Sequence, residues 1–322
     1  MLTSIHNKMG DIMCTAIKYQ NNQCLFGRTL DVPTSYGEEL IIIPRNKEMK
    51  YRYLKKQHFH YAMLGIGLYR EAFPLYFDAI NEKGLGIAGL NFPKEAYYEK
   101  RIEEELNLCV FELIPYLLGC CGSVEEVKQV LAQIHLCDEA FSDTLSTTPL
   151  HWLICDQKEC MVLESTKRGL HFMDNPVGVL TNSPTFDYHM QHLQQYQNIT
   201  NFPQNTKWGN YQLKPYSYGM NAIGLPGDFS SSSRFVRMVY LKEHVKSKND
   251  IDTFFHLMYQ VMVLKGWVYI DDKNDQSTKY ISCYDLKKGI LYYQIEEELK
   301  FFNINLNDYL DEQEVFVQLL KK

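Results

Sequence analysis

The stretch that decides the fold is Cys14-Thr-Ala-Ile-Lys-Tyr-Gln-Asn-Asn-Gln-Cys-Leu-Phe-Gly-Arg28. Its polar centre, Gln20–Gln23, is turn-prone and is flanked by two apolar-rich runs, which predicts a β-hairpin. If the hairpin closes at the middle of the polar centre, Cys14 lies opposite position 28 or 29. We therefore expect Cys14 to lie beside Arg28, with Asp31 just beyond it.

Further strands and helices follow along the chain. Short apolar runs predict strands, and apolar residues recurring at helical spacing predict helices. The expected strands span 40–43, 61–64, 86–90, 151–155, 161–164, 280–284 and 290–294, and the expected helices span 102–118, 186–197, 233–246 and 251–264. Another helix should begin at Ser123, where Glu126 completes a capping box. Many strands with paired helices, and no linker or repeat, indicate one domain, a layered α/β sandwich with substantial antiparallel pairing.

Composition excludes several classes of protein. The 322 residues are 45% apolar and 22% charged, which is ordinary for a globular chain and unlike a disordered one. The formal net charge is -6 and no long Lys/Arg block occurs, so nucleic acid is not an expected partner. No apolar run approaches the ~18 residues of a membrane span, and residues 1–13 lack the apolar core of a signal peptide. We expect a cytoplasmic protein that has no membrane partner.

The spacing of cysteine and histidine argues against a metal site. Nine cysteines are spread thinly over a long chain, unlike a secreted disulfide scaffold, so most are expected to be reduced and buried. Cys155 and Cys160 flank a turn, but no second Cys/His pair follows at zinc-finger distance. His189 and His192 lie on an expected helix without the carboxylate of a metalloprotease motif. No metal is therefore expected.

The pair Met13-Cys14 offers another chemistry. If translation begins at Met13, its removal leaves Cys14 with a thiol and a free α-amine on one residue. Such an amine, which in peptides ordinarily titrates near pH ~7.7–8.0, can act as the base for the thiol. Arg28 would favour the thiolate, and Asp31 could hold the amine. The alternative is structural: a buried strand cysteine beside an Arg–Asp salt bridge.

Three further residues lie at positions where a hydrogen-bond donor or a charge could take part in catalysis. Asn91 ends the strand expected at 86–90, and Asn182 follows another apolar strand. A side-chain amide or a backbone N–H at a strand end can stabilise an oxyanion, although both residues could instead turn the chain. Arg234 would lie in the first turn of a helix, where the helix dipole disfavours a cation. Either a compensating anion or plain solvent exposure would explain that position.

Longer motifs, taken together and in order, resemble those of a known family. They include Phe26-Gly-Arg-Thr-Leu-Asp31, Asn81-Glu-Lys-Gly-Leu-Gly86, Ala88-Gly-Leu-Asn-Phe-Pro93, Val179-Leu-Thr-Asn-Ser-Pro-Thr-Phe-Asp187 and Leu225-Pro-Gly-Asp-Phe229 with Ser233-Arg-Phe235. Over most of its length the chain resembles the choloylglycine hydrolase family of N-terminal-nucleophile hydrolases, which contains bile salt hydrolases and penicillin V acylases. The resemblance implies an α+β fold, a four-layer αββα sandwich, and hydrolysis of a linear amide bond with no cofactor.

The resemblance also implies a role for each candidate residue. The implied catalytic set consists of Cys14, Arg28, Asp31, Asn91, Asn182 and Arg234. The cysteine is the nucleophile, Arg28 and Asp31 position and activate it, and Arg234 is a charged partner in the pocket. The asparagines stabilise the oxyanion, through the side chain at 182 and the backbone N–H at 91. The apolar candidates for substrate contact are Leu30, Phe73, Leu136 and Phe141, each of which could equally be a core residue.

The favoured interpretation is a bile salt hydrolase that cleaves glycine- or taurine-conjugated bile acids, because an asparagine at position 91 resembles that branch of the family. A penicillin V acylase, or an acylase of N-acyl homoserine lactones, would use the same site. A non-catalytic ligand-binding protein is the third alternative, and it applies if Cys14 does not become the amino terminus.

The sequence also allows predictions about residues 1–13 and about one long loop. Residues 1–13 are expected to be a leader or a misassigned start that is removed, which leaves a single hydrolase domain over 14–322. Residues 199–220 are polar and aromatic, as in a long surface loop, and loops of that length are usually functional or interfacial. Their 205–220 part resembles the tetramer-assembly segment of the family, so a homotetramer is expected.

Overall fold

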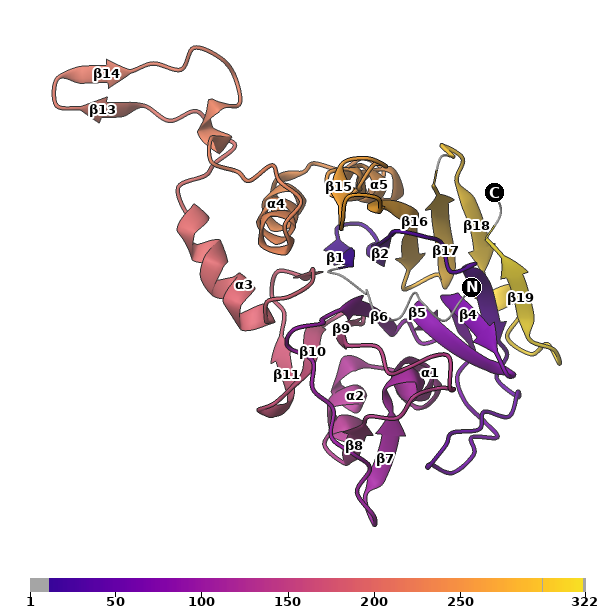
Figure 1. Cartoon of the computed structure of the whole chain (residues 1–322). Helices are drawn as coiled ribbons and strands as arrows, with labels where there is room; N and C mark the ends of the chain where they lie inside the picture. Colours follow the sequence, from indigo (N-terminus) through magenta and orange to yellow (C-terminus); the bar gives the residue numbers. More distant parts are fainter. Residues whose placement is uncertain (1–11, 297, 321–322) are drawn as a thin grey trace.

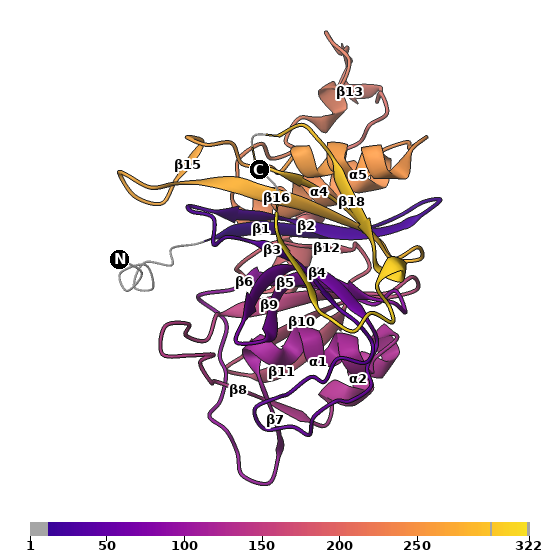
Figure 2. The same ribbon diagram turned by 90° about the vertical axis from the view of Figure 1, so that its right-hand side faces the viewer.

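The computed structural model describes residues 12–296 and 298–320, and it is built in four layers. Two sheets lie face to face in the middle, and helices cover the outer face of each sheet (Figures 1 and 2). The helices are α1 (Leu113–Cys120), α2 (Val124–Leu131), α3 (Phe186–Leu193), α4 (Ser231–His244) and α5 (Asp250–Tyr259). α4 and α5 cover the first sheet, and α1 and α2 cover the second. The expected αββα sandwich is confirmed.

Both central sheets are antiparallel throughout the described residues. The first has the order β12 (Val179–Leu180), β1 (Met13–Gln20), β2 (Cys24–Val32), β16 (Asp275–Asp285), β17 (Ile290–Ile295) and β18 (Phe302–Asn305), with β15 (Val268–Tyr269) also paired to β16. The second has the order β11 (Gly169–Asp174), β10 (Cys160–Thr166), β9 (Leu150–Cys155), β6 (Gly86–Asn91), β5 (Phe73–Asn81), β4 (Met63–Arg70), β3 (Glu39–Ile43) and β19 (Phe316–Leu319). The amino-terminal hairpin, β1–β2, therefore lies inside the first sheet, where both of its faces are covered.

Side-chain alternation along the second sheet fills two cores. In β9, Leu153 and Cys155 face the first sheet, whereas Trp152 and Ile154 face α1 and α2. This follows from the two-residue period of a strand. Because both faces are buried, β9 is apolar along most of its length, and a polar side chain on the inner face of this sheet must find a partner inside the protein.

Most expected strands are confirmed, but the helix expected over 102–118 is wrong in its first half. Leu106–Cys109 forms β7, which pairs in parallel with β8 (Ile134–Cys137), and the α-helix begins only at Leu113. Pro115 explains the difference, since proline lacks an N–H and clashes with the preceding turn in a helix interior. With the helix starting at Leu113, Pro115 falls in the first turn, where it is tolerated.

The helix expected to begin at Ser123 is confirmed as α2. Ser123 Oγ accepts a hydrogen bond of 3.2 Å from the Glu126 N–H, as an N-cap residue does. The Glu126 carboxylate accepts from the N–H of Gly122 rather than from that of Ser123, so the box is displaced by one residue. No helix in the described part of the chain is long and apolar enough to cross a membrane.

The long loop expected over 199–220 carries a small hairpin of its own. β13 (Thr206–Trp208) pairs with β14 (Tyr211–Leu213), and Figure 1 shows this hairpin projecting away from the four layers. Trp208 and Tyr211 at its turn are both more than 70% exposed. Large exposed aromatic side chains in one segment are typical of an interaction surface.

Gly27 in β2 illustrates how closely the first sheet is packed. A Cβ at this position would lie 1.9 Å from the main-chain oxygen of Ser282 on β16. We expect Gly27→Ala to lower the free energy of unfolding by about 3 kcal/mol or to prevent folding, because overpacking forces the strands apart. Gly227→Ala is the control, since its Cβ would meet no atom within 4 Å. Urea unfolding of both variants tests this, and an equal effect at the two positions would contradict it.

Candidate active site

The hairpin brings Cys14 and Arg28 together, although not in the expected register. Cys14 lies opposite Leu30, and Arg28 lies opposite Ala16. The expected pairing of 14 with 28 or 29 is wrong because the turn is centred on Asn22, so that Gln20 pairs with Cys24 and Cys14 with Leu30. Residues 28 and 30 share one face of β2, so the Arg28 side chain reaches Cys14 diagonally. Its Nη2 donates to Cys14 Sγ over 2.5 Å.

Arg28 is itself held inside the protein from the second sheet. Its guanidinium is 1% exposed, donates to the carbonyl of Gly89, and lies 4.0 Å from the buried Asp78 carboxylate. That carboxylate accepts from the hydroxyls of Tyr280 and of Tyr284 on β16, the latter over 2.8 Å. Burial acts to lower the pKa of Arg28, but the electrostatic influence of Cys14 and of Asp78 outweighs it and raises the pKa. Arg28 therefore stays a cation.

The Cys14 thiol is 2% exposed, and opposing influences act on it. Burial raises its pKa, Arg28 is the strongest influence that lowers it, and the net result is a raised pKa. The nitrogen of Cys14, which here belongs to the peptide bond with Met13, donates to Asn182 Oδ1 over 2.8 Å. An α-amine at this position would thus lie against a side-chain acceptor and beside the thiol.

Asp31 follows Leu30, the residue opposite Cys14, and itself lies opposite Met13. Its carboxylate accepts from Thr278 Oγ1 over 2.6 Å and from Thr29 Oγ1 over 3.0 Å. Burial raises the pKa of this carboxyl, and Arg234 is the strongest influence in the other direction. Asp31 is therefore a buried acid opposite the residue that precedes Cys14.

Arg234 joins the helical layer to the hairpin. It lies in the first turn of α4 and is completely buried, which excludes solvent exposure as the reason for a cation there. Its guanidinium donates to the carbonyl of Cys14, to Thr15 Oγ1 over 2.7 Å and to Asn182 Oδ1 over 2.8 Å. Burial lowers the pKa of Arg234, while Asp31 and Cys14 act to raise it. The compensating partners are thus acceptors and anions of the site itself.

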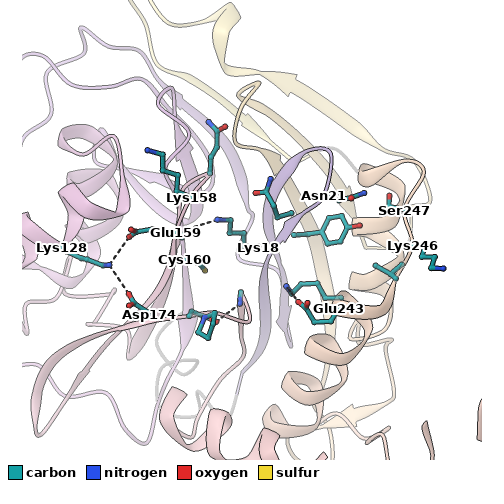
Figure 3. Close-up of a pocket in the computed structure, with 18 residues that line it drawn as sticks. Lys18, Asn21, Lys128, Lys158, Glu159, Cys160, Asp174, Glu243, Lys246 and Ser247 are labelled. Carbon is teal, nitrogen blue, oxygen red and sulfur yellow. Dashed lines mark hydrogen bonds and ion pairs between the residues drawn. The ribbon is translucent and has the colours of Figure 1, made fainter. Parts of the chain in front are cut away.

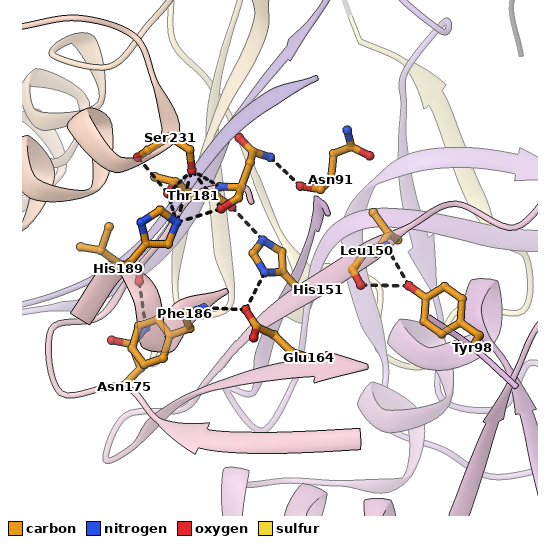
Figure 4. Close-up of polar contacts among 12 residues, drawn as sticks. Asn91, Tyr98, Leu150, His151, Glu164, Asn175, Thr181, Phe186, His189 and Ser231 are labelled. Atoms are coloured by element: carbon orange, nitrogen blue, oxygen red, sulfur yellow. Dashed lines mark hydrogen bonds and ion pairs between the residues drawn. The ribbon is translucent and has the colours of Figure 1, made fainter. Parts of the chain in front are cut away.

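The two asparagines are hydrogen-bonded to each other beside the cysteine, and Figure 4 labels Asn91 at this place. Asn182 Nδ2 donates to the carbonyl of Asn91 over 2.9 Å, which leaves the second hydrogen of this amide free for another acceptor. Asn91 is 4% exposed, and neither polar atom of its side chain has a partner in the described residues. A buried unpartnered amide is costly, so this side chain is suited to a polar group of a ligand.

An apolar cavity of about 220 Å³ opens on Cys14, Arg28 and Asn91. Of the four expected contacts, Leu30 and Phe141 line it. Phe73 packs against Phe141 from behind, with ring centroids 6.5 Å apart, and Leu136 lies in the core beneath the second sheet. Neither borders this cavity in the described residues, so we do not carry Phe73 or Leu136 into the proposed contacts.

Sequence reasoning missed several groups at the site. Tyr36, Phe111 and Trp152 also line the cavity, and burial raises the pKa of Tyr36 to about 12. Asp78 had a signal, since it is a single acid in the apolar run Phe73–Ile80, but no strand was expected there. A charge inside a buried strand requires a partner, and here that partner is Arg28.

A larger cavity of about 890 Å³ lies at the turn end of the hairpin (Figure 3). It is polar, and its lysines are partly paired: Lys128 Nζ lies 3.2 Å from both Glu159 and Asp174. None of the catalytic candidates lines it. Within the described residues, no group of three or more His, Cys, Asp or Glu side chains is placed to hold a metal ion. The candidate site is therefore the apolar cavity at Cys14.

Removal of the Arg28 charge tests this electrostatic account. In Arg28→Met we expect a higher pKa for Cys14, because the strongest influence that lowers it is lost, and the thiolate fraction at neutral pH should fall by about 10-fold or more. The measurement is the rate of Cys14 alkylation by iodoacetamide between about pH 6 and about pH 10, with Arg28→Lys and the distant Arg45→Met as controls. A profile of Arg28→Met that coincides with that of the unmodified protein would contradict the account.

Comparison with known proteins identifies the family. The model of the linear amide C–N hydrolases of the choloylglycine hydrolase family matches residues 14–318. A bile salt hydrolase/transferase from Lactiplantibacillus plantarum is 43% identical over 309 residues, which cover 94% of this chain and 95% of that protein. One from Clostridium perfringens is 38% identical over 315 residues, with coverage of 94% and 95%.

Solved structures agree with the sequence comparison. A mutant conjugated bile acid hydrolase from Clostridium perfringens superposes with a TM-score of 0.89 at 35% identity, covering 96% of this chain and 97% of that one. Penicillin V acylase from Agrobacterium tumefaciens has a TM-score of 0.74 at 21% identity, with coverage of 95% and 90%, and shares the fold. The chain belongs to the choloylglycine hydrolase family of linear amide C–N hydrolases.

Proposed function

We propose that this protein is a bile salt hydrolase, which cleaves the amide bond between a steroid acyl group and glycine or taurine. The observation that carries the proposal is the position of Cys14 Sγ, hydrogen-bonded to Arg28 at one end of an apolar cavity. The names of the similar proteins support the substrate class. The apolar walls suit a steroid, and the unpartnered amide of Asn91 suits the polar conjugate.

The reaction requires that the peptide bond between Met13 and Cys14 be cleaved, so that Cys14 carries an α-amine. The thiolate attacks the amide carbonyl carbon, and the oxyanion is stabilised by Asn182 Nδ2 and the N–H of Asn91. Each such donor contributes about 3–4 kcal/mol. The α-ammonium protonates the departing amine, which leaves a thioester on Cys14. Water, deprotonated by the α-amine, then attacks the thioester and releases the bile acid.

Removal of the leading residues would also reshape the cavity. Ile12 is one of the residues that line it, so loss of residues 1–13 would take away part of its wall. We propose that residues 14–322 form the working hydrolase domain. A penicillin V acylase is the second candidate, because the same apolar walls would accept a phenoxy group.

The direct test is release of amine from glycocholate, taurocholate and penicillin V by protein whose mass confirms Cys14 at the amino terminus. We expect rapid turnover of at least one bile salt and slower cleavage of penicillin V. Cys14→Ser should lower kcat by roughly 10³-fold or more without loss of the fold, because the nucleophile is lost. Cys120→Ser, at a cysteine outside the site, should keep full activity. Preference for penicillin V would favour the second candidate, and normal turnover by Cys14→Ser would refute the mechanism.

We also propose that the protein is a homotetramer, in keeping with the cytoplasmic enzyme expected from the sequence. The support is the projecting β13–β14 hairpin, whose segment exposes Phe202, Trp208, Tyr211, Tyr216 and Tyr218 to solvent in the single chain. Burial of such side chains against a second copy would stabilise an assembly by about 1.5–3 kcal/mol for each.

Light scattering after size-exclusion chromatography tests the assembly. We expect the unmodified protein to have the mass of four chains, and the double variant Trp208→Ala with Tyr211→Ala to shift toward smaller species. Phe59→Ala is the matched control, because Phe59 is 85% exposed on a different loop. A monomeric unmodified protein, or a double variant with unchanged mass, would refute the proposed role of the hairpin.

A further inference from the structure

A buried imidazole–carboxylate pair lies close to Asn91 and Thr181, and the catalytic steps above do not use it (Figure 4). His151 on β9 is completely buried, Glu164 on β10 is 3% exposed, and His151 Nδ1 lies 3.1 Å from Glu164 Oε1. We propose that His151 and Glu164 are positioning residues that hold the two oxyanion donors at a fixed separation. This inference rests on the function proposed above.

The partners of His151 define what it donates. Its Nε2 lies 2.9 Å from the carbonyl oxygen of Thr181, which can only accept. Glu164 Oε1, on the other side of the ring, also accepts from the N–H of Phe186 over 2.9 Å. Both ring nitrogens therefore face acceptors. Nε2–H is the donor to Thr181, and the carboxylate holds the ring in the orientation that points it there.

The Thr181 carbonyl belongs to the peptide unit that carries the N–H of Asn182. That N–H donates to Ser231 Oγ over 2.9 Å, and the carbonyl of Asn182 lies 2.9 Å from His189 Nε2. Burial lowers the pKa of His189 to about 4, so this second imidazole is neutral and donates through Nε2. Three side chains thus fix the peptide planes on both sides of Asn182. The Asn182 amide can therefore keep one orientation in the site.

His151 also contacts the chain neighbours of the other oxyanion residue, Asn91. His151 pairs with Leu90 across β9 and β6, and its ring stacks on Phe92 with centroids 4.2 Å apart and planes at 9°. Asn91 lies between these two contacts in the chain. His151 is therefore joined to both neighbours of Asn91, to Leu90 by strand pairing and to Phe92 by its ring, and the ring also contacts the residue before Asn182. Displacement of about 1 Å at such a site can cost about 100-fold in rate.

Stability alone does not account for this pair, since the desolvation of a buried pair of polar side chains costs about as much free energy as their attraction returns. Two substitutions separate the contacts of the ring. In His151→Gln the new side-chain amide reaches the place of Nε2 and keeps the donor to Thr181. The shorter amide in His151→Asn takes the place of Nδ1, which keeps a partner for Glu164 but leaves Thr181 without a donor.

We expect His151→Asn to lower kcat for conjugated bile salts by roughly 10-fold to 100-fold, with KM changed by less than about 2-fold. His151→Gln should stay within about 3-fold of the unmodified enzyme, because it restores the donor. Alkylation of Cys14 by iodoacetamide should be unchanged in both variants, since that reaction uses the thiolate and no oxyanion donor. A purely structural role would not separate kcat from alkylation in this way.

His135→Asn is the matched control. His135 has the same kinds of partner away from the site, with Nε2 3.0 Å from the Lys100 carbonyl and Nδ1 3.5 Å from Glu105. We expect it to leave kcat unchanged. Glu164→Gln is a second arm, which keeps an acceptor for Phe186 and removes the charge that orients the ring, and it should lower kcat without slowing alkylation.

The inference is overturned if His151→Asn or Glu164→Gln keeps full kcat, or if alkylation of Cys14 slows in parallel with kcat. Thermal unfolding identifies variants that do not fold. If His151→Asn is one of them, the kcat of Glu164→Gln is the test of the inference. An unmodified enzyme that cleaves no bile salt would refute the proposed function itself. That outcome is distinct from an active enzyme in which the variants have no effect.

Discussion

At the centre of the molecule the Arg28 guanidinium donates to the Cys14 sulfur, and the rest of the site depends on this contact. A thiolate that is almost completely buried needs a cation beside it, and a buried cation needs an anion in turn. Asp78 is that anion, and it is held by Tyr280 and Tyr284, which reach it from the opposite sheet. The reactivity of the cysteine therefore depends on the packing of the two central sheets against each other.

Arg234, on helix α4, is a second buried cation that is balanced by partners inside the site. It contacts the carbonyl of Cys14 and the side chain of Asn182, and its charge is balanced by Asp31. The two buried arginines and the two buried aspartates cancel in charge. An α-ammonium and a thiolate on one cysteine preserve that balance. We infer that the interior is arranged to hold this zwitterion, which is the form that the proposed attack requires.

Much of this arrangement could be predicted from the sequence, because it depends on local patterns. The apolar runs predicted most strands of both sheets, and the short polar turn predicted the hairpin that places Cys14 near Arg28. The long motifs then assigned roles to residues far apart in the chain, and the structure brings Asn91, Asn182 and Arg234 to the same place.

The failures have physical causes. The register of the hairpin depends on which residues of the polar stretch form the turn, and composition does not distinguish the alternatives. The helix expected at 102–118 followed apolar spacing and ignored Pro115, while β7 depends on pairing with β8, which is remote in sequence. Phe73 and Leu136 are apolar in the core as they would be in a pocket, so residue type alone could not place them.

The most direct test of the account is the covalent intermediate. Protein with Cys14 at the amino terminus is mixed with glycocholate and quenched in acid within the first turnovers, and its peptides are weighed by mass spectrometry. The account predicts a cholyl group attached to the peptide that begins at Cys14, formed by the unmodified enzyme and about 10-fold or more less abundant in Arg28→Met under the same conditions. An adduct on another residue, or turnover of glycocholate with no adduct at any quench time, would contradict the claim that Cys14, activated by Arg28, is the nucleophile.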